Sequence, residues 1–163
     1  MNYKRLGCIT ALLVVLIFPV PANVISFLVV ETGLNETNQS TEFGTIWEGA
    51  LMSSFFDAGH IVTNSPMMRM EKKPEQGLAD PVRNDFNTAV LGGAEYFILG
   101  YLDHEIQGRR IVPVDITIKT YRTDTQELLF EQKFPVGNTG NMREEFQFAK
   151  DAGRQLISKL RDR

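Results

Sequence analysis

Two histidines and the acids beside them are the residues of this 163-residue sequence that could hold a metal ion. His60 follows Asp57, and His104 lies between Asp103 and Glu105. Imidazole and carboxylate donors together suit a divalent metal or a small hydrolytic site. However, His60 begins one expected strand and His104 ends another that should run parallel to it. We therefore expect the two histidines at opposite edges of the sheet, and no metal site.

Three closely spaced methionines, Met67, Met68 and Met70, carry the soft thioether sulfurs that Cu(I) selects. Methionines also pack adaptably inside proteins and on partner-facing surfaces. We expect packing rather than copper binding, with contact to a partner as the alternative. Arg109 and Arg110 form a small positive tip, which suits a soluble hairpin end or a contact with an acidic partner or lipid headgroup.

Other candidates for catalysis lack the geometry that the chemistry needs. Glu144 and Glu145 are adjacent in an expected helix, where side chains point about 100° apart, so we expect a solvated first turn. Ser53 and Ser54 lie in mid-helix, without the strained turn of a nucleophile elbow. The loop GNTG at 137–140 could cradle an anion, but neither GxGxxG nor GxxxxGK occurs. We expect no catalytic residues and no cofactor.

The amino terminus has the layout of a secretory signal. Lys4 and Arg5 precede an uncharged apolar run at 6–18. Val20 and Ala22 are the small residues expected before a cleavage site. We therefore expect cleavage directly after Ala22.

Cleavage there divides the chain into a signal peptide, residues 1–22, and one exported domain, residues 23–163. The alternatives are a membrane anchor formed by residues 6–30, which its prolines disfavour, and a lipid on Cys8, which the following apolar run disfavours. Cys8 is the only cysteine, so the mature domain can have no disulfide. An exported domain without disulfides is typical of a bacterial periplasm.

Charge and length exclude further classes of protein. The net charge is −3, and no basic stripe is present to follow a phosphate backbone, so we expect no nucleic-acid partner. A mature chain of about 140 residues suits a single domain with one core.

Hydrophobic patterns predict the elements that position these residues. Continuous apolar runs predict strands covered on both faces, apolar stripes of helical period predict amphipathic helices, and strict alternation predicts an antiparallel strand with one wet face. In chain order, we expect strand 24–31, helix 42–57, strand 60–64, helix 81–91, strand 94–105, strand 112–119, strand 128–136 and helix 142–160.

Four details of this prediction are specific enough to fail. Strand 60–64 is expected to be buried, and residues 66–80 to form a surface loop. Asp80 is expected to cap the second helix, with proline at its first position. On strand 112–119, Val112, Val114, Ile116 and Ile118 are expected on the core face, with Asp115, Thr117 and Lys119 on the wet face.

The order β-α-β-α-β-β-β-α, with DAGHIVTNSP, the strand GAEYFILG and the turn DTQELL, resembles a group of bacterial envelope domains. The group includes the amino-terminal domain of TolB, the periplasmic part of the curli-secretion channel and the lipoprotein activators of penicillin-binding proteins. The resemblance implies a non-enzymatic assembly or regulatory module with no catalytic residues. The chain departs from the lipoprotein members because no cysteine follows its signal.

We therefore expect a mixed α/β domain, with a single five-stranded mixed sheet and three helices, that is periplasmic and binds another envelope protein. The contact would use sheet edges, the methionine segment or the arginine tip. The alternative is a small periplasmic metal-binding protein or enzyme that uses His60 and His104. Direct membrane contact is expected only if the amino-terminal helix is retained.

Overall fold

The computed structural model describes residues 22–34, 42–108 and 110–162. The expected signal peptide up to residue 21, with Cys8, lies outside the described residues, as does Arg109. The elements are, in chain order, β1 (Val24–Thr32), α1 (Glu42–Asp57), β2 (Ile61–Asn64), β3 (Met68–Met70), α2 (Asp80–Leu91), β4 (Tyr96–Gln107), β5 (Arg110–Arg122), β6 (Leu128–Pro135) and α3 (Met142–Arg161).

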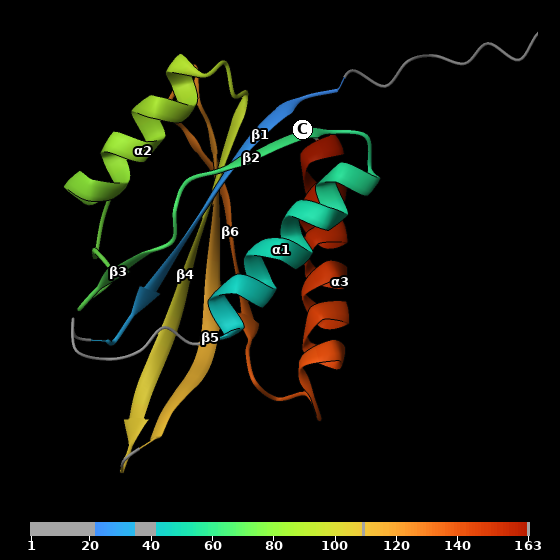
Figure 1. Cartoon of the computed structure of the whole chain (residues 1–163). Helices are drawn as coiled ribbons and strands as arrows, with labels where there is room; N and C mark the ends of the chain where they lie inside the picture. The colour runs from blue at the N-terminus through green and yellow to red at the C-terminus, as the bar shows by residue number, and fades with distance from the viewer. Residues whose placement is uncertain (1–21, 35–41, 109, 163) are drawn as a thin grey trace, which may run out of the picture.

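One mixed sheet carries all the strands, in the order β2-β1-β4-β5-β6 (Figure 1). β1 is parallel to β2, β3 and β4, whereas β4, β5 and β6 form an antiparallel meander. The predicted mixed α/β fold is therefore confirmed. The short strand β3 pairs with β1 beyond the end of β2 and adds a sixth strand to the expected five.

Helices cover both faces of the sheet. α1 and α3 pack side by side on one face, and α2 lies on the other (Figure 1). Alternate residues of β1 point to the two cores, because side chains of a strand alternate between faces. The α1–α3 core includes Phe27, Trp47, Phe55, Ile98 and Leu156, and the α2 core includes Leu28, Val82, Phe86, Phe97 and Leu99. No helix in the described ranges is both long and apolar enough to cross a membrane.

The expectation of a buried strand at 60–64 is wrong. β2 is an edge strand, and Ile61 is 54% exposed. Phe56, at the end of α1, is 68% exposed and contributes little to the core. The cap of α2 is Ala79, which makes no side-chain hydrogen bond, so Asp80 is the first helical residue instead of the cap.

The expected wet face of β5 is covered. Thr117 is 1% exposed, and Lys73 Nζ lies 3.1 Å from its hydroxyl, because the segment that leads to α2 crosses this face. A bulge opposite Asp103 and His104 shifts the register by one residue, so His104 pairs with Pro113. The uninterrupted alternation predicted Val112 and Ile116 on the same core face. Because of the bulge, the two side chains lie on opposite faces, so this prediction is wrong for Val112.

Candidate functional site

A buried charged cluster joins the ends of three parallel strands. Glu31 of β1 is completely buried, and its carboxylate lies 3.4 Å from Arg69 Nε of β3 and 4.0 Å from His104 Nε2 of β4. His104 Nδ1 lies 3.2 Å from the carbonyl oxygen of Thr32, which makes Nδ1 the donor. In open α/β sheets this edge is where ligands commonly bind. Here the charged groups bind one another and hold β1, β3 and β4 together.

A second cluster of polar side chains lies at the same end of the strands, on the face of the sheet that α2 covers. Asp103 and Asp115 are directly opposite on β4 and β5, where two carboxylates repel. Lys73 Nζ lies 3.5 Å from Asp103, and Lys133 Nζ lies 2.7 Å from Asp115. The hydrogen bond with Asp115, with the charges of Asp115 and Asp103, raises the pKa of Lys133. Thr32 also donates to Asp103, so these carboxylates are already paired. They line an open pocket of about 480 Å³.

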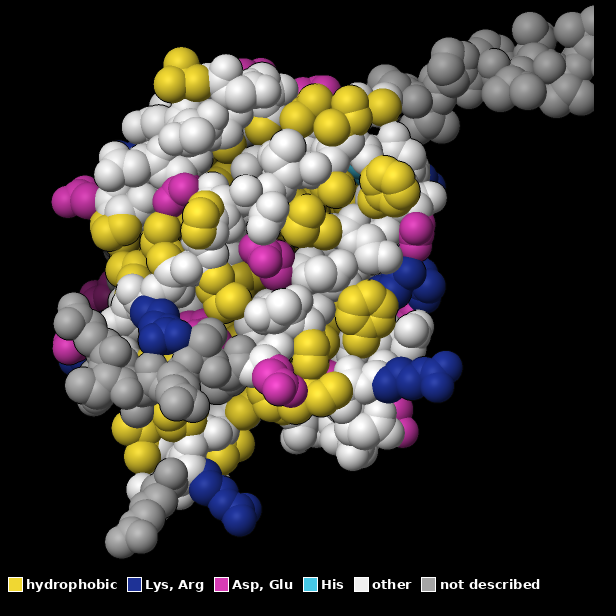
Figure 2. All heavy atoms as spheres, in the orientation of Figure 1, with side chains coloured by type: hydrophobic (Ala, Val, Ile, Leu, Met, Phe, Trp, Pro, Cys, Tyr) yellow, Lys and Arg dark blue, Asp and Glu magenta, His cyan; other side chains and the backbone are white. Residues whose placement is uncertain are grey.

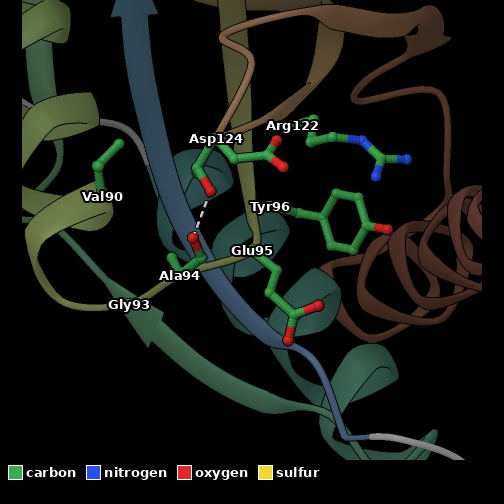
Figure 3. Close-up of a pocket in the computed structure, with 8 residues that line it drawn as sticks. Val90, Gly93, Ala94, Glu95, Tyr96, Arg122 and Asp124 are labelled. Atoms are coloured by element: carbon green, nitrogen blue, oxygen red, sulfur yellow. Dashed lines mark hydrogen bonds between the residues drawn. The ribbon is translucent and has the colours of Figure 1, made fainter.

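A pocket of about 280 Å³ lies at the other end of the strands, where β4 begins and β5 ends (Figure 3). Tyr96 and Arg122 line it side by side, with the guanidinium 5.9 Å from the ring centroid. Two carboxylates, Glu95 and Asp124, complete its polar wall. The hydroxyl of Thr123 donates to the carbonyl of Ala94, shown by the dashed line, so it is not held as a nucleophile.

The two histidines lie at opposite ends of the parallel strands, as the parallel strand order predicts. β1 pairs with Ile61 at its first residue and with Asp103 at its last. His60 packs on Phe55, and burial, followed by the charge of Arg161, lowers the pKa of its imidazole. Within the described ranges, no three His, Cys, Asp or Glu side chains are placed to hold a metal ion. The alternative site that would use both histidines is therefore not formed.

The methionine segment is divided between the two cores. Met67 packs with the α1–α3 core, and its sulfur lies against Gly44. Met68 and Met70 belong to β3 and pack with the α2 core. Because the sulfurs lie on different faces of the sheet, this placement favours packing over a shared copper ion. All three side chains are half-buried, so contact with a partner remains a proposal.

The GNTG loop already holds a carboxylate of this chain. Glu145 is 1% exposed, so the expectation of a solvated pair of glutamates is wrong for this residue. Its carboxylate accepts from Trp47 Nε1 at 2.8 Å, from the Thr139 hydroxyl at 2.7 Å and from the Gly137 amide at 3.3 Å. The loop therefore binds an internal anion. The sequence signal that could have identified this residue is weak: Trp47, in an apolar stripe, needs an acceptor for its indole N–H.

Ser54 serves helix packing. Its hydroxyl donates to the carbonyls of Ala50 at 2.9 Å and Lys150 at 3.0 Å, and therefore bridges α1 and α3. Gly153 of α3 lies directly against it, so close that a methyl group there would approach the Ser54 oxygen to 2.6 Å. The hydroxyl is therefore part of a close helix contact.

The β4–β5 hairpin extends beyond its neighbours as an arm, of which the structure describes residues 105–108 and 110–112. The ladder with β1 ends at Asp103 and the ladder with β6 ends at Asp115. His104 and Val114 still bond to Thr32 and Val136, and beyond them the two strands are paired with each other. Ile106 is 59% exposed on this arm, and Arg110 is also exposed. Figure 1 shows the arm projecting past the sheet, and Figure 2 shows hydrophobic side chains near its base and one basic side chain close to its end. Arg110 of the predicted arginine tip is on this arm, whereas Arg109 lies outside the described residues, and the projection of the arm was not predicted.

No protein-family model and no curated protein matches this sequence. Solved structures similar in fold include a PelC dodecamer from Paraburkholderia phytofirmans, with TM-score 0.49, 12% identity and coverage of 85% of this chain and 87% of that chain. TolB from Acinetobacter baumannii gives TM-score 0.44 and 15% identity over 84% of this chain and 28% of that chain. The LpoB C-terminal domain from Salmonella enterica gives TM-score 0.45 and 13% identity over 71% of this chain and 82% of that chain.

TolB and LpoB belong to the group that the sequence resembles, so the predicted resemblance is confirmed at the level of the fold. With identities of 12–15% and TM-scores below 0.5, we draw no functional argument from these structures.

Proposed function

We propose that this chain is an exported module of the bacterial cell envelope that binds another envelope protein and catalyses no reaction. The signal-like layout of residues 1–22, with a cleavage site between Ala22 and Asn23, supports export. If residues 6–30 were retained as an anchor, the same domain would act at the membrane surface.

The observation that carries the proposal is the exposed apolar surface of the β4–β5 arm. Ile106 is directly opposite Ile111, which is half-buried, and Arg110 lies beside them. A two-stranded ribbon is only marginally stable by itself, and burial of the exposed Ile106 side chain against a partner would stabilise it. The exposed guanidinium favours an acidic surface on that partner. We include Arg109 in this contact from its place in the sequence.

Two further surfaces support a binding function. β2 has an open outer edge among the described strands, where an extended segment of a partner can add as a new strand. The neighbouring methionines, Met67, Met68 and Met70, can adapt to such a segment because their side chains are flexible. The polar groups that might have supported catalysis are instead engaged within the chain, as Glu31, Asp115 and Glu145 illustrate.

Affinity capture from the native envelope tests this proposal. We expect the tagged chain to recover a stoichiometric partner, and the substitution Ile106→Asp to lower recovery by roughly tenfold or more, because a charge replaces a central apolar contact. The matched control is Leu91→Asp, since Leu91 is 89% exposed at the other end of the sheet. Equal recovery by the native chain and Ile106→Asp would show that the arm is not the contact.

A further inference from the structure

The outer edge of β6 is open in the described part of the chain. β6 is the last strand in the sheet, and it pairs only with β5. The outer edge of this eight-residue strand presents unpaired backbone N–H and C=O groups at alternate residues, except for the N–H that Pro135 lacks. The side chains of the strand then decide which further strand can pair with it.

The centre of β6 is complementary to itself when two copies meet in antiparallel orientation. Residues 130–134 read FEQKF, with an acid and a base at equal distances on either side of Gln132. A two-fold axis through Gln132 places Glu131 opposite Lys133 of the second copy, and Phe130 opposite Phe134 of the second copy. Opposite charges in direct cross-strand positions stabilise such a pairing, whereas Phe134 is largely buried in the core of its own copy.

The neighbouring registers are unfavourable. Backbone groups of an antiparallel strand point alternately to its two sides, so a two-fold pairing of identical edges requires the axis to pass through a residue. An axis through Glu131 would place two glutamates opposite each other, and an axis through Lys133 would place two lysines opposite each other. Like charges in these positions destabilise the pair, so the axis at Gln132 is favoured over both of its neighbours.

Internal ion pairs continue the same charge pattern. Glu131 lies 3.4 Å from Lys119 of β5, and Lys133 lies 2.7 Å from Asp115. Pairing at this register would therefore produce a row of alternating charge across four strands, with Lys119 and Glu131 of one copy followed by Lys133 and Asp115 of the other. Glu131 and Lys133 are both exposed and accessible to a second copy.

The helix that lies above β6, α3, also carries opposite charges on either side of the proposed axis. Gln132 Nε2 lies 3.1 Å from Gln155 Oε1, so an axis through Gln132 also passes close to Gln155 of α3. Two antiparallel copies of α3 would then place Asp151 opposite Lys159, because these residues lie one turn on either side of Gln155. Both side chains are exposed and opposite in charge.

We propose that the β6 edge binds a second copy of this chain and forms a two-fold dimer with a continuous sheet, centred on Gln132. This inference goes beyond the proposed function and uses a different surface. The β4–β5 arm and the edge of β2 stay free for another partner in such a dimer.

A charge-reversal experiment on the full chain tests the pairing. We expect sedimentation velocity to show a dimer for the native chain and a dissociation constant roughly tenfold higher or more for Glu131→Lys and for Lys133→Glu, since each substitution creates two like-charge contacts. An equimolar mixture of the two variants should restore the dimer, because every contact then joins a lysine to a glutamate. Circular dichroism of each variant checks folding, as each also loses an internal ion pair.

Cross-linking tests the position of the axis. In a Cys8→Ser background, Gln132→Cys should form a disulfide-linked dimer on mild oxidation, because the two side chains face each other at the axis. Thr63→Cys, exposed on β2 at the opposite edge, is the matched control and should remain monomeric. The proposal is overturned by a native chain that stays monomeric, by a mixture that associates no better than either variant alone, or by equal cross-linking at Thr63.

Discussion

Single residues show where physical chemistry departs from sequence pattern. Glu145 lies next to Glu144 in the first turn of α3, yet Glu144 is exposed and Glu145 is buried. The period of a helix alone does not explain burial of a charge, because that depends on donors from distant segments. Here Trp47 is 98 residues away in sequence, so the hydrogen bond could not be predicted from local spacing.

Substitution of Glu145 tests the internal role of this carboxylate. We expect Glu145→Gln to lower the free energy of unfolding by about 1–3 kcal/mol, because charge-assisted hydrogen bonds to buried donors are lost. Urea denaturation measures this change. Glu144→Gln is the matched control and should cost less than about 1 kcal/mol, since Glu144 is exposed at a helix terminus. Equal effects of the two substitutions would show that the hydrogen bonds of Glu145 add no more to the free energy of unfolding than those of Glu144.

At the scale of elements, the sequence predicted most of the fold. Apolar runs and helical stripes identified α1, α2 and α3 and five of the strands, because each has a face that must be buried. β3 was missed, since three residues are too few to show a period and the strand depends on pairing with β1. The bulge at His104 was also missed, because register is fixed by the partner strand and not by local composition.

The contact between α1 and α3 gives a prediction at this scale. We expect Gly153→Ala to lower the free energy of unfolding by about 1–3 kcal/mol, because the added methyl overpacks the site at Ser54. Gly49→Ala, on α1, is the matched control: a methyl there meets nothing within 4 Å, so the variant should be more stable by about 0.5–1 kcal/mol. Thermal unfolding distinguishes the two. A neutral or stabilising Gly153→Ala would mean that the helices are not in close contact.

At the scale of the whole molecule, the two cores are apolar, several charged groups pair within the chain, and a few apolar side chains remain exposed. The charged groups at the carboxyl ends of the strands are paired with one another, whereas Ile106 on the arm is exposed. The sequence predicted that His60 and His104 lie at opposite ends of parallel strands, and the strand register places them there. It could not predict which surface projects, because that depends on where the neighbouring strands end.

In-cell photo-cross-linking from position 106 is the most direct test of the account that the arm binds an envelope protein. A photoreactive amino acid at Ile106 should yield one dominant adduct with an envelope protein, while the same group at Leu91, which is exposed at the other end, should yield none. Mass spectrometry identifies the adduct and shows whether the chain begins at Asn23. The account is contradicted if position 106 yields no adduct, if the two positions cross-link equally, or if the adduct contains only cytoplasmic proteins.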